Sequence, residues 1–142
     1  MLSLLAQDVQ DDLLDYQRLD GLLPELHQAL LRRDNGRIGE LNAQIEPCCE
    51  QLRMRAQRRS KALAALGLGG GAVAMNRLLQ HYPAEPRRQL ETGWQRLGEA
   101  AVRCADCNER NGRLLAMHHE IIEQLLGDST RRQLYAPHGH AY

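Results

Sequence analysis

The residues of this chain most suited to chemistry are its four cysteines, which fall into two pairs. Cys48 and Cys49 are adjacent, and Cys104 and Cys107 form a Cys-x-x-Cys pair. Four thiols match the donor count of a zinc site, but zinc-binding pairs lie in tight turns, whereas both pairs here fall within helical patterns. Thioredoxin-like chemistry needs a strand–helix–strand context that is absent. We therefore expect no metal and no cofactor, and interpret Cys104 as a small buried apolar residue.

The histidines offer no better catalytic arrangement. His118 falls on an apolar helical position, where a histidine more often belongs to a core or an interface than to a metal site. His138 and His140 lie near the end of the chain with no fixed carboxylate to orient them. The sequence also lacks the Gly-x-Ser-x-Gly, His-Glu-x-x-His and glycine-rich nucleotide motifs. We therefore do not expect an enzyme.

Two charged runs are complementary if the first half of the chain folds back on itself. An antiparallel hairpin that turns at Asn35 and Gly36 brings together residues whose numbers sum to about 71. We interpret the contacts as exposed ion pairs of about 0.2 to 1 kcal/mol each. The alternative is that the basic run forms a patch for nucleic acid or an acidic partner. The facing acidic run, however, already accounts for the clustering of these basic residues. The two runs are Asp8, Asp11, Asp12 and Asp15, and Arg55, Arg58, Arg59 and Lys61.

The elements that carry these residues are helical. Apolar residues recur every three or four positions over residues 2–30, 38–66 and 86–126, and the last segment keeps a seven-residue repeat. Glycines at 67–71 break the second pattern before a short helix at 72–81. Pro24 and Pro47 should kink or divide their helices. We predict an all-α fold, an elongated antiparallel bundle of three long helices plus one short helix, with coiled-coil-like packing and residues 86–126 as its spine.

Composition limits which classes of partner and which cellular compartment we expect for this chain. The formal net charge is zero and aromatic residues are 4% of the chain, so neither a basic field nor a stacking platform favours nucleic acid. No apolar run is long enough for membrane insertion, and no signal peptide is evident, so we expect a cytoplasmic protein with reduced cysteines. Periodicity ends near Asp128, which predicts a bundle domain at 1–128 and a mobile C-terminal docking tail at 129–142.

Two features of residues 86–126 point beyond folding. Asn108 and Asn111 occupy consecutive positions on the apolar seam, where a buried amide fixes register. Further on, two adjacent stripes are apolar, which is wider than packing against one neighbour requires. The sequence leaves open whether the chain's own bundle, a fourth element or a partner covers them. They comprise Leu114, Leu115, Met117, Ile121, Ile122, Leu125 and Leu126.

Three blocks in the last third of the chain resemble the FlgN family of flagellar export chaperones. The resemblance, which includes the early leucine heptads, covers nearly the whole chain. One departure is Ala136, where the family often has a glycine. The blocks are Asn108-x-x-Asn111-Gly112-x-Leu114-Leu115, Leu125-Leu126-Gly127 and Leu134-Tyr135-Ala136-Pro137-His138-Gly139.

The resemblance implies a cytosolic chaperone for the hook–filament junction proteins FlgK and FlgL, which binds their C-terminal segments before type III export. It assigns docking on the cytoplasmic domain of the export gate FlhA to Tyr135. The alternative is a coiled-coil structural or scaffold protein that self-associates through the same stripe, with Asn108 and Asn111 setting register. The resemblance assigns client binding to Leu114, Leu115, Met117, His118, Ile121, Ile122, Leu125 and Leu126.

Overall fold

The computed structural model of the chain describes residues 2–135, and every element in that range is helical. The helices are α1 (Leu2–Arg32), α2 (Asn35–Ala65), α3 (Gly71–Leu79) and α4 (Ala84–Tyr135). Three of them are long and α3 is short, which confirms the predicted all-α class and helix order. α1 and α2 continue through Pro24 and Pro47, so neither proline divides its helix.

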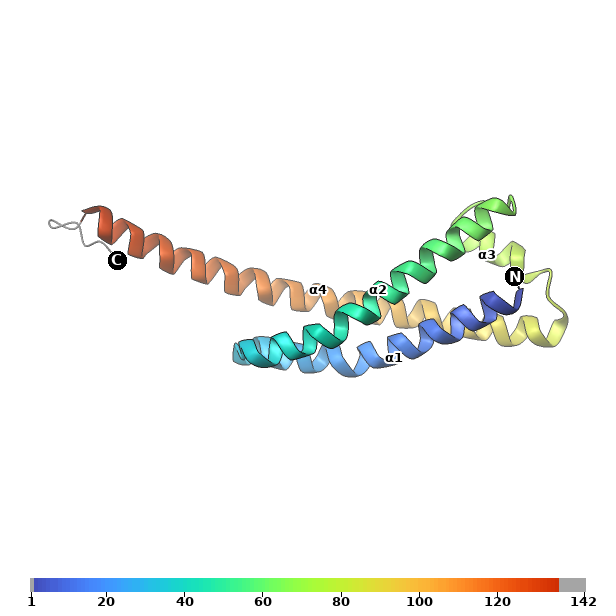
Figure 1. The fold of residues 1–142 in the computed structure, drawn as a ribbon, viewed down its shortest axis with the longest axis horizontal. Helices are drawn as coiled ribbons and strands as arrows, with labels where there is room; N and C mark the ends of the chain where they lie inside the picture. The colour runs from blue at the N-terminus through green and yellow to red at the C-terminus, as the bar shows by residue number, and fades with distance from the viewer. Residues whose placement is uncertain (1, 136–142) are drawn as a thin grey trace.

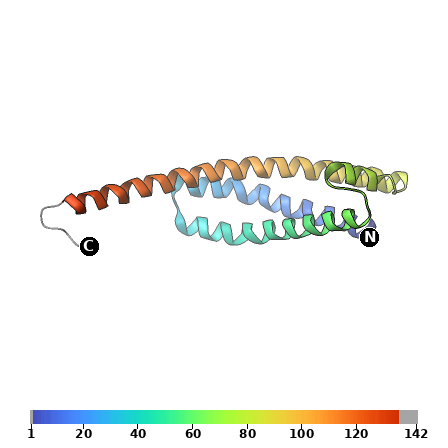
Figure 2. The same ribbon diagram turned by 90° about the horizontal axis from the view of Figure 1, so that it is seen from above.

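The long helices are arranged up, down and up, and α1 lies in the middle (Figures 1 and 2). α2 returns antiparallel to α1, and α4 then runs parallel to α1 (Figure 1). α1 packs along both partners, whereas the backbones of α2 and α4 do not approach each other within the described residues. The prediction that the last helix is the spine was therefore wrong in detail, because α1 is the helix that both others contact.

The hairpin turn between α1 and α2 is short and locally capped. Arg33 has a positive φ of 55°, and the Asp34 side chain accepts a hydrogen bond of 3.1 Å from the Arg37 backbone N–H. An aspartate in this position satisfies a free amide of the first helical turn. The turn thus falls at Arg33 and Asp34, just before the predicted Asn35 and Gly36, which already belong to α2.

A glycine-rich connection leads from α2 into α3. Gly67, Gly69 and Gly71 have φ values of 71°, 86° and 70°, a left-handed conformation that a side chain disfavours. This path turns the chain back so that α3 covers the open end of the helices. Ala74 and Met75 of α3 are buried there.

The core consists of two apolar clusters along the length of the helices. The first lies where α3 meets the start of α1, and the second lies toward the hairpin turn. Buried residues of the first are Leu5, Val9, Leu63, Ala74, Met75, Leu78, Leu79, Tyr82 and Leu90. Buried residues of the second are Leu19, Leu23, Leu26, Ala29, Leu30, Leu41, Ile45, Cys48 and Cys104.

Candidate functional site

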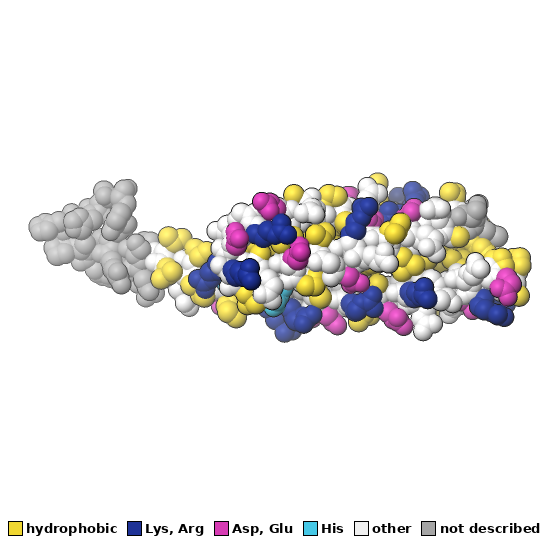
Figure 3. All heavy atoms as spheres, turned by 90° about the horizontal axis from the view of Figure 1, so that it is seen from below, with side chains coloured by type: hydrophobic (Ala, Val, Ile, Leu, Met, Phe, Trp, Pro, Cys, Tyr) yellow, Lys and Arg dark blue, Asp and Glu magenta, His cyan; other side chains and the backbone are white. Residues whose placement is uncertain are grey.

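Near its C-terminal end, α4 extends beyond the bundle with apolar side chains exposed (Figure 3). Buried positions on α4 run from Leu90 to Asn111 and then stop within the residues whose burial is described. Past that point, five large apolar side chains are between 50% and 64% exposed. We call the eight residues predicted for client binding the distal stripe. Leu115, Met117, Ile122, Leu125 and Leu126 are exposed, and Leu114, His118 and Ile121 are half-buried.

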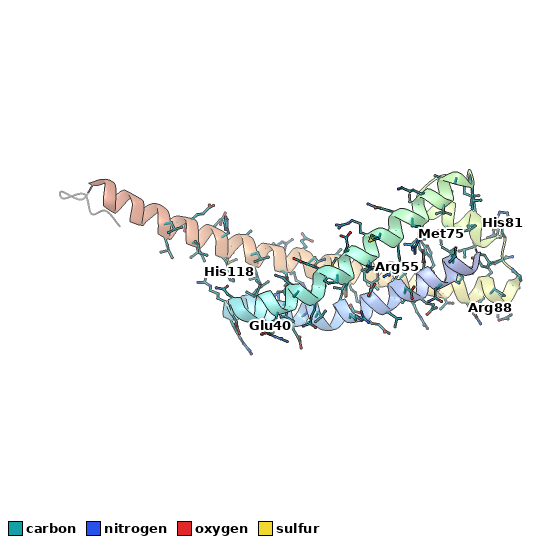
Figure 4. The ribbon with its side chains drawn as sticks, in the orientation of Figure 1. Glu40, Arg55, Met75, His81, Arg88 and His118 are labelled. Atoms are coloured by element: carbon teal, nitrogen blue, oxygen red, sulfur yellow. The ribbon has the colours of Figure 1, made fainter. Side chains whose placement is uncertain are left out.

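The register between α1 and α4 decides where the bundle ends. Arg103 Nη2 lies 3.3 Å from Asp20 Oδ2, and Asn111 Oδ1 lies 2.9 Å from His27 Nδ1. These partners are 83 and 84 residues apart in the chain, as parallel helices require. At that offset the end of α1 is level with about residue 116 of α4. Figure 4 shows His118 beside the hairpin turn, and α4 continues from there for roughly five turns.

Asn111 is held inside the chain. It is 4% exposed, and its Nδ2 donates a hydrogen bond of 3.3 Å to the Leu23 carbonyl. Asn108, predicted on the same seam, is instead exposed, and its Nδ2 lies 3.7 Å from Cys104 Sγ. The line of α4 that faces α1 steps from Cys104 through Cys107 to Asn111, and Asn108 lies beside this line. Only one of the two amides therefore fixes the register of α4 on α1.

The predicted contact between the two charged runs is present, but it is buried. Asp12 is 1% exposed and lies between Arg55 and Arg59 of α2, with Arg59 Nη1 donating to its Oδ2 at 3.0 Å. Arg55 also pairs with Asp15. The interpretation as exposed pairs was wrong for this cluster. Arg55, Arg59, Asp12 and Asp15 occupy the seam between α1 and α2, whereas Arg58, paired with Asp8, and Arg18, paired with Asp15, stay largely in solvent. Lys61 of the predicted basic run is exposed and forms no ion pair with another described residue.

Two arginines of this cluster show how burial and pairing compete. Burial lowers the pKa of the Arg55 guanidinium, but hydrogen bonds to Asp12 and Asp15 outweigh it and leave the pKa above its ordinary value. Arg59 lies over the indole ring of Trp94, 5.2 Å from the ring centroid. Because Trp94 belongs to α4, this cation–π contact joins α2 to α4 although their backbones stay apart.

The cysteines are free thiols of the packed helices. Burial, and then the neighbouring thiol of Cys49, raises the pKa of Cys104 from 9.0 to about 11, so the thiol is a poor nucleophile at neutral pH. No group of three or more His, Cys, Asp or Glu side chains within the described residues is placed to hold a metal. His138 and His140 lie outside the described residues.

The comparison with known families gives a match over almost the whole chain. The family model described as FlgN protein matches residues 1–140. The chain belongs to the FlgN family. FlgN proteins are flagellar export chaperones. In this member, the described residues form four helices, and the extended last helix carries the distal stripe. No curated protein and no solved structure matches the chain.

Two further observations bear on partners of this FlgN protein. Within the described residues, no helix is both long and apolar enough to cross a membrane. α4 includes residues 129–135, where the sequence predicted a tail separate from the bundle, and Tyr135 is the last residue of the helix. Residues 136–142 lie outside the described residues, and the docking role of this segment stays a prediction.

Sequence reasoning missed two features of the site. The burial of Asp12 and Asp15 could have been read from the α1 pattern, because both residues lie on the three- and four-residue steps that link Val9 to Leu19. The second feature is the point at which α4 passes the end of α1, near residue 116, which leaves the distal stripe outside the bundle. No local sequence signal reveals this, since it depends on how far α4 extends past α1.

Proposed function

We propose that this FlgN protein binds the C-terminal segments of FlgK and FlgL in the cytoplasm through its distal stripe, and delivers them to the cytoplasmic domain of FlhA. The observation that supports this most directly is the exposure of the stripe. Large apolar side chains gathered on one face of a helix that has left its own bundle are typical of a binding surface. Family membership supports the chaperone role, while the clients and the gate contact are proposals.

The stripe suits an amphipathic client segment. A helix lays apolar side chains at every third or fourth position into a groove or onto a face with the same spacing, and the distal stripe repeats in that way from Leu114 to Leu125. A client that orders as it binds gives up about 2 to 5 kcal/mol of the interaction free energy. That cost keeps the affinity moderate and permits release at the export gate.

Client binding and gate docking are separable along α4. Tyr135 lies roughly two and a half turns beyond Leu126 on the same helix. A client seated on the distal stripe therefore leaves the end of α4 accessible. Tyr135→Ala should keep client binding and reduce capture of the FlhA cytoplasmic domain.

The alternative, a self-associating coiled-coil scaffold, needs a polar residue to set oligomer register. Asn111 is used within the chain, by the Leu23 carbonyl and by His27, so it is not available to a second copy. Asn108 is exposed and is the remaining candidate. This use of Asn111 favours the chaperone over the scaffold, although weak self-association through the stripe is compatible with either.

A pull-down with the C-terminal segment of FlgK tests the proposal. Ile122→Asp and Leu125→Asp each place a charge in the distal stripe and should abolish co-purification. Val102→Asp is the matched control, because Val102 is 62% exposed on the same helix but lies outside the stripe. Normal capture of FlgK by folded Ile122→Asp protein would contradict the assignment of the client site.

A further inference from the structure

The chain contains two Asn-Gly pairs, and they lie in very different surroundings. One is Asn35-Gly36, next to the hairpin turn, and the other is Asn111-Gly112, within α4. An asparagine followed by glycine deamidates readily, because glycine has no side chain to keep its backbone nitrogen away from the asparagine side chain. Both pairs have the same local chemistry in the unfolded chain. Any difference between their rates of deamidation in the folded protein therefore comes from the structure.

The reacting groups of the first pair are free. Asn35 and Gly36 are exposed at the start of α2. The first amides of a helix have no acceptor inside that helix. Arg37 N–H donates to the Asp34 side chain, and Ile38 N–H donates to the Asp34 carbonyl. Gly36 N–H has no acceptor among the described residues, and the Asn35 carboxamide forms no hydrogen bond with any of them. No competing bond thus holds the nitrogen or the carboxamide.

The first turn of α2 can open without disturbing the core. The reaction requires the Asn35 backbone to leave its helical conformation, so this turn must open first. Residues 35–37 are already exposed, and the first buried residue of α2 is Leu41. Opening therefore uncovers little apolar surface and breaks few bonds, as is typical of fraying at a helix end. Asn35 reaches the reactive geometry while the rest of the bundle stays folded.

The second pair is held by the packing of α4 on α1. Asn111 is 4% exposed, its Nδ2 donates to the Leu23 carbonyl, and its Oδ1 lies 2.9 Å from His27 Nδ1. Gly112 lies in the interior of α4, where backbone N–H groups are used by the helix. Bringing the Gly112 nitrogen to the Asn111 side chain would require α4 to unwind within its interface with α1. The folded structure therefore protects this pair.

We propose that Asn35 is a site of spontaneous deamidation in this protein and that folding protects Asn111. The Gly36 nitrogen forms a bond to Asn35 Cγ, the Cγ–Nδ2 bond breaks, and ammonia leaves with the proton of the Gly36 amide. Water then opens the resulting succinimide ring at either carbonyl, which yields aspartate or isoaspartate. The reaction consumes one water and releases one ammonia. It needs no client, so it does not depend on the proposed function.

Either product places a new carboxylate at the start of α2. Aspartate at this position is favoured by the helix dipole. Isoaspartate instead routes the backbone through the side chain and adds a methylene group, which interrupts the first helical turn. The change falls at the end of the bundle beyond which α4 extends (Figure 1). Because each product carries one more negative charge than the original chain, ion exchange separates the modified protein from the unmodified protein.

The test incubates the full chain at mildly alkaline pH under reducing conditions and follows both asparagines by peptide mapping with mass spectrometry. A parallel sample in guanidinium chloride gives the rate of each pair in the unfolded chain. In the folded chain Asn35 should convert, and Asn111 should convert at least about a hundredfold more slowly. In guanidinium chloride the two rates should be similar. The rate at Asn35 should also rise with pH, because the attacking amide must lose its proton.

Three variants separate the chemical step from the opening of the turn. Gly36→Ala adds a Cβ that meets only Asp34 Oδ1, at 3.7 Å, so the turn is kept while the rate at Asn35 should fall about tenfold. Gly112→Ala is the matched control, since its Cβ meets no atom within 4 Å, and it should leave the rate at Asn35 unchanged. Asp34→Ala removes the cap on Arg37 N–H and should raise the rate at Asn35 about fivefold.

Three results would overturn the proposal. The first is an Asn35 that stays intact in the folded chain while it converts in guanidinium chloride, because the first turn of α2 then stays closed. The second is equal conversion of Asn35 and Asn111 in the folded chain, because the fold then gives no protection. The third is a rate at Asn35 that Gly36→Ala leaves unchanged, because the Gly36 nitrogen is then not the attacking group.

Discussion

Asp12 of α1 and Arg59 of α2 form an ion pair inside the protein, with Arg59 Nη1 3.0 Å from Asp12 Oδ2 and only 1% of Asp12 exposed. The pair separates the two apolar clusters of the core, one toward α3 and one toward the hairpin turn. Such a pair constrains the register of α1 against α2, because sliding either helix leaves a charge buried without its partner. It therefore contributes to specificity as well as to stability.

Replacing Asp12 by asparagine should destabilise the protein strongly. Arg55 and Arg59 would keep their burial but lose a charged partner, which costs about 3 kcal/mol when a buried pair is broken. Asp11→Asn is the matched control from the same acidic run. The Asp11 carboxylate accepts a hydrogen bond from the exposed side chain of Gln7, so the substitution should cost under about 0.5 kcal/mol of stability. Urea unfolding of both variants measures the difference, and equal midpoints would contradict it.

Asn111→Ala should lower the free energy of unfolding by about 1 to 3 kcal/mol. The substitution removes the donor to the Leu23 carbonyl and the partner of His27, and leaves both groups at the α1–α4 interface. Asn108→Ala is the control and should change stability by less than about 0.5 kcal/mol, because Asn108 is exposed. Thermal unfolding followed by circular dichroism distinguishes the two. A larger loss at Asn108 would refute the assignment of the register to Asn111.

The Asp12–Arg59 pair shows how much of the fold could be predicted from the sequence. The pairing of α1 with α2 was predicted from the charge pattern, and Arg59 with Asp12 falls on the predicted sum of residue numbers. The burial of this ion pair was not predicted, because the charged residues were expected to lie at the surface. Helical periodicity gave the number and kind of helices because each apolar seam repeats over many turns.

The alignment of α4 on α1 could not be predicted in the same way. A seven-residue repeat fits its neighbour equally well after a slip of one heptad, so the pattern alone does not say where α4 leaves the bundle. The alignment depends on particular contacts, Asn111 with Leu23 and Gly93 with Val9. The distal stripe is exposed because of this alignment. The sequence alone therefore could not show whether another part of the chain covers the stripe.

Stability should decrease as the pH rises above about 9. Burial, followed by the charge on Cys49, raises the pKa of Cys104 from 9.0 to about 11, so in that range the folded state keeps a proton that the unfolded state releases. The stability from this thiol is complete below pH 9.0 and is lost as the pH approaches 11. Burial raises the pKa values of Tyr16 and Tyr82 too, with the same sign. Urea midpoints measured under reducing conditions should fall less steeply with pH in Cys104→Ala, and an unchanged slope would exclude Cys104 as a cause.

Gly93 and Gly98 lie in the same helix, yet alanine should have opposite effects at the two positions. Alanine favours a helix interior by about 1 kcal/mol over glycine, and a Cβ at Gly98 meets no atom within 4 Å, so Gly98→Ala should stabilise the protein by about 0.5 to 1 kcal/mol. A Cβ at Gly93 would lie 3.2 Å from Val9 Cγ1, and Val9 is 1% exposed with little room to move. Gly93→Ala should therefore push α4 from α1 and lower the urea midpoint despite its better helix propensity. Equal stabilisation by both substitutions would mean that the close approach of α1 and α4 at Val9 does not constrain the alignment.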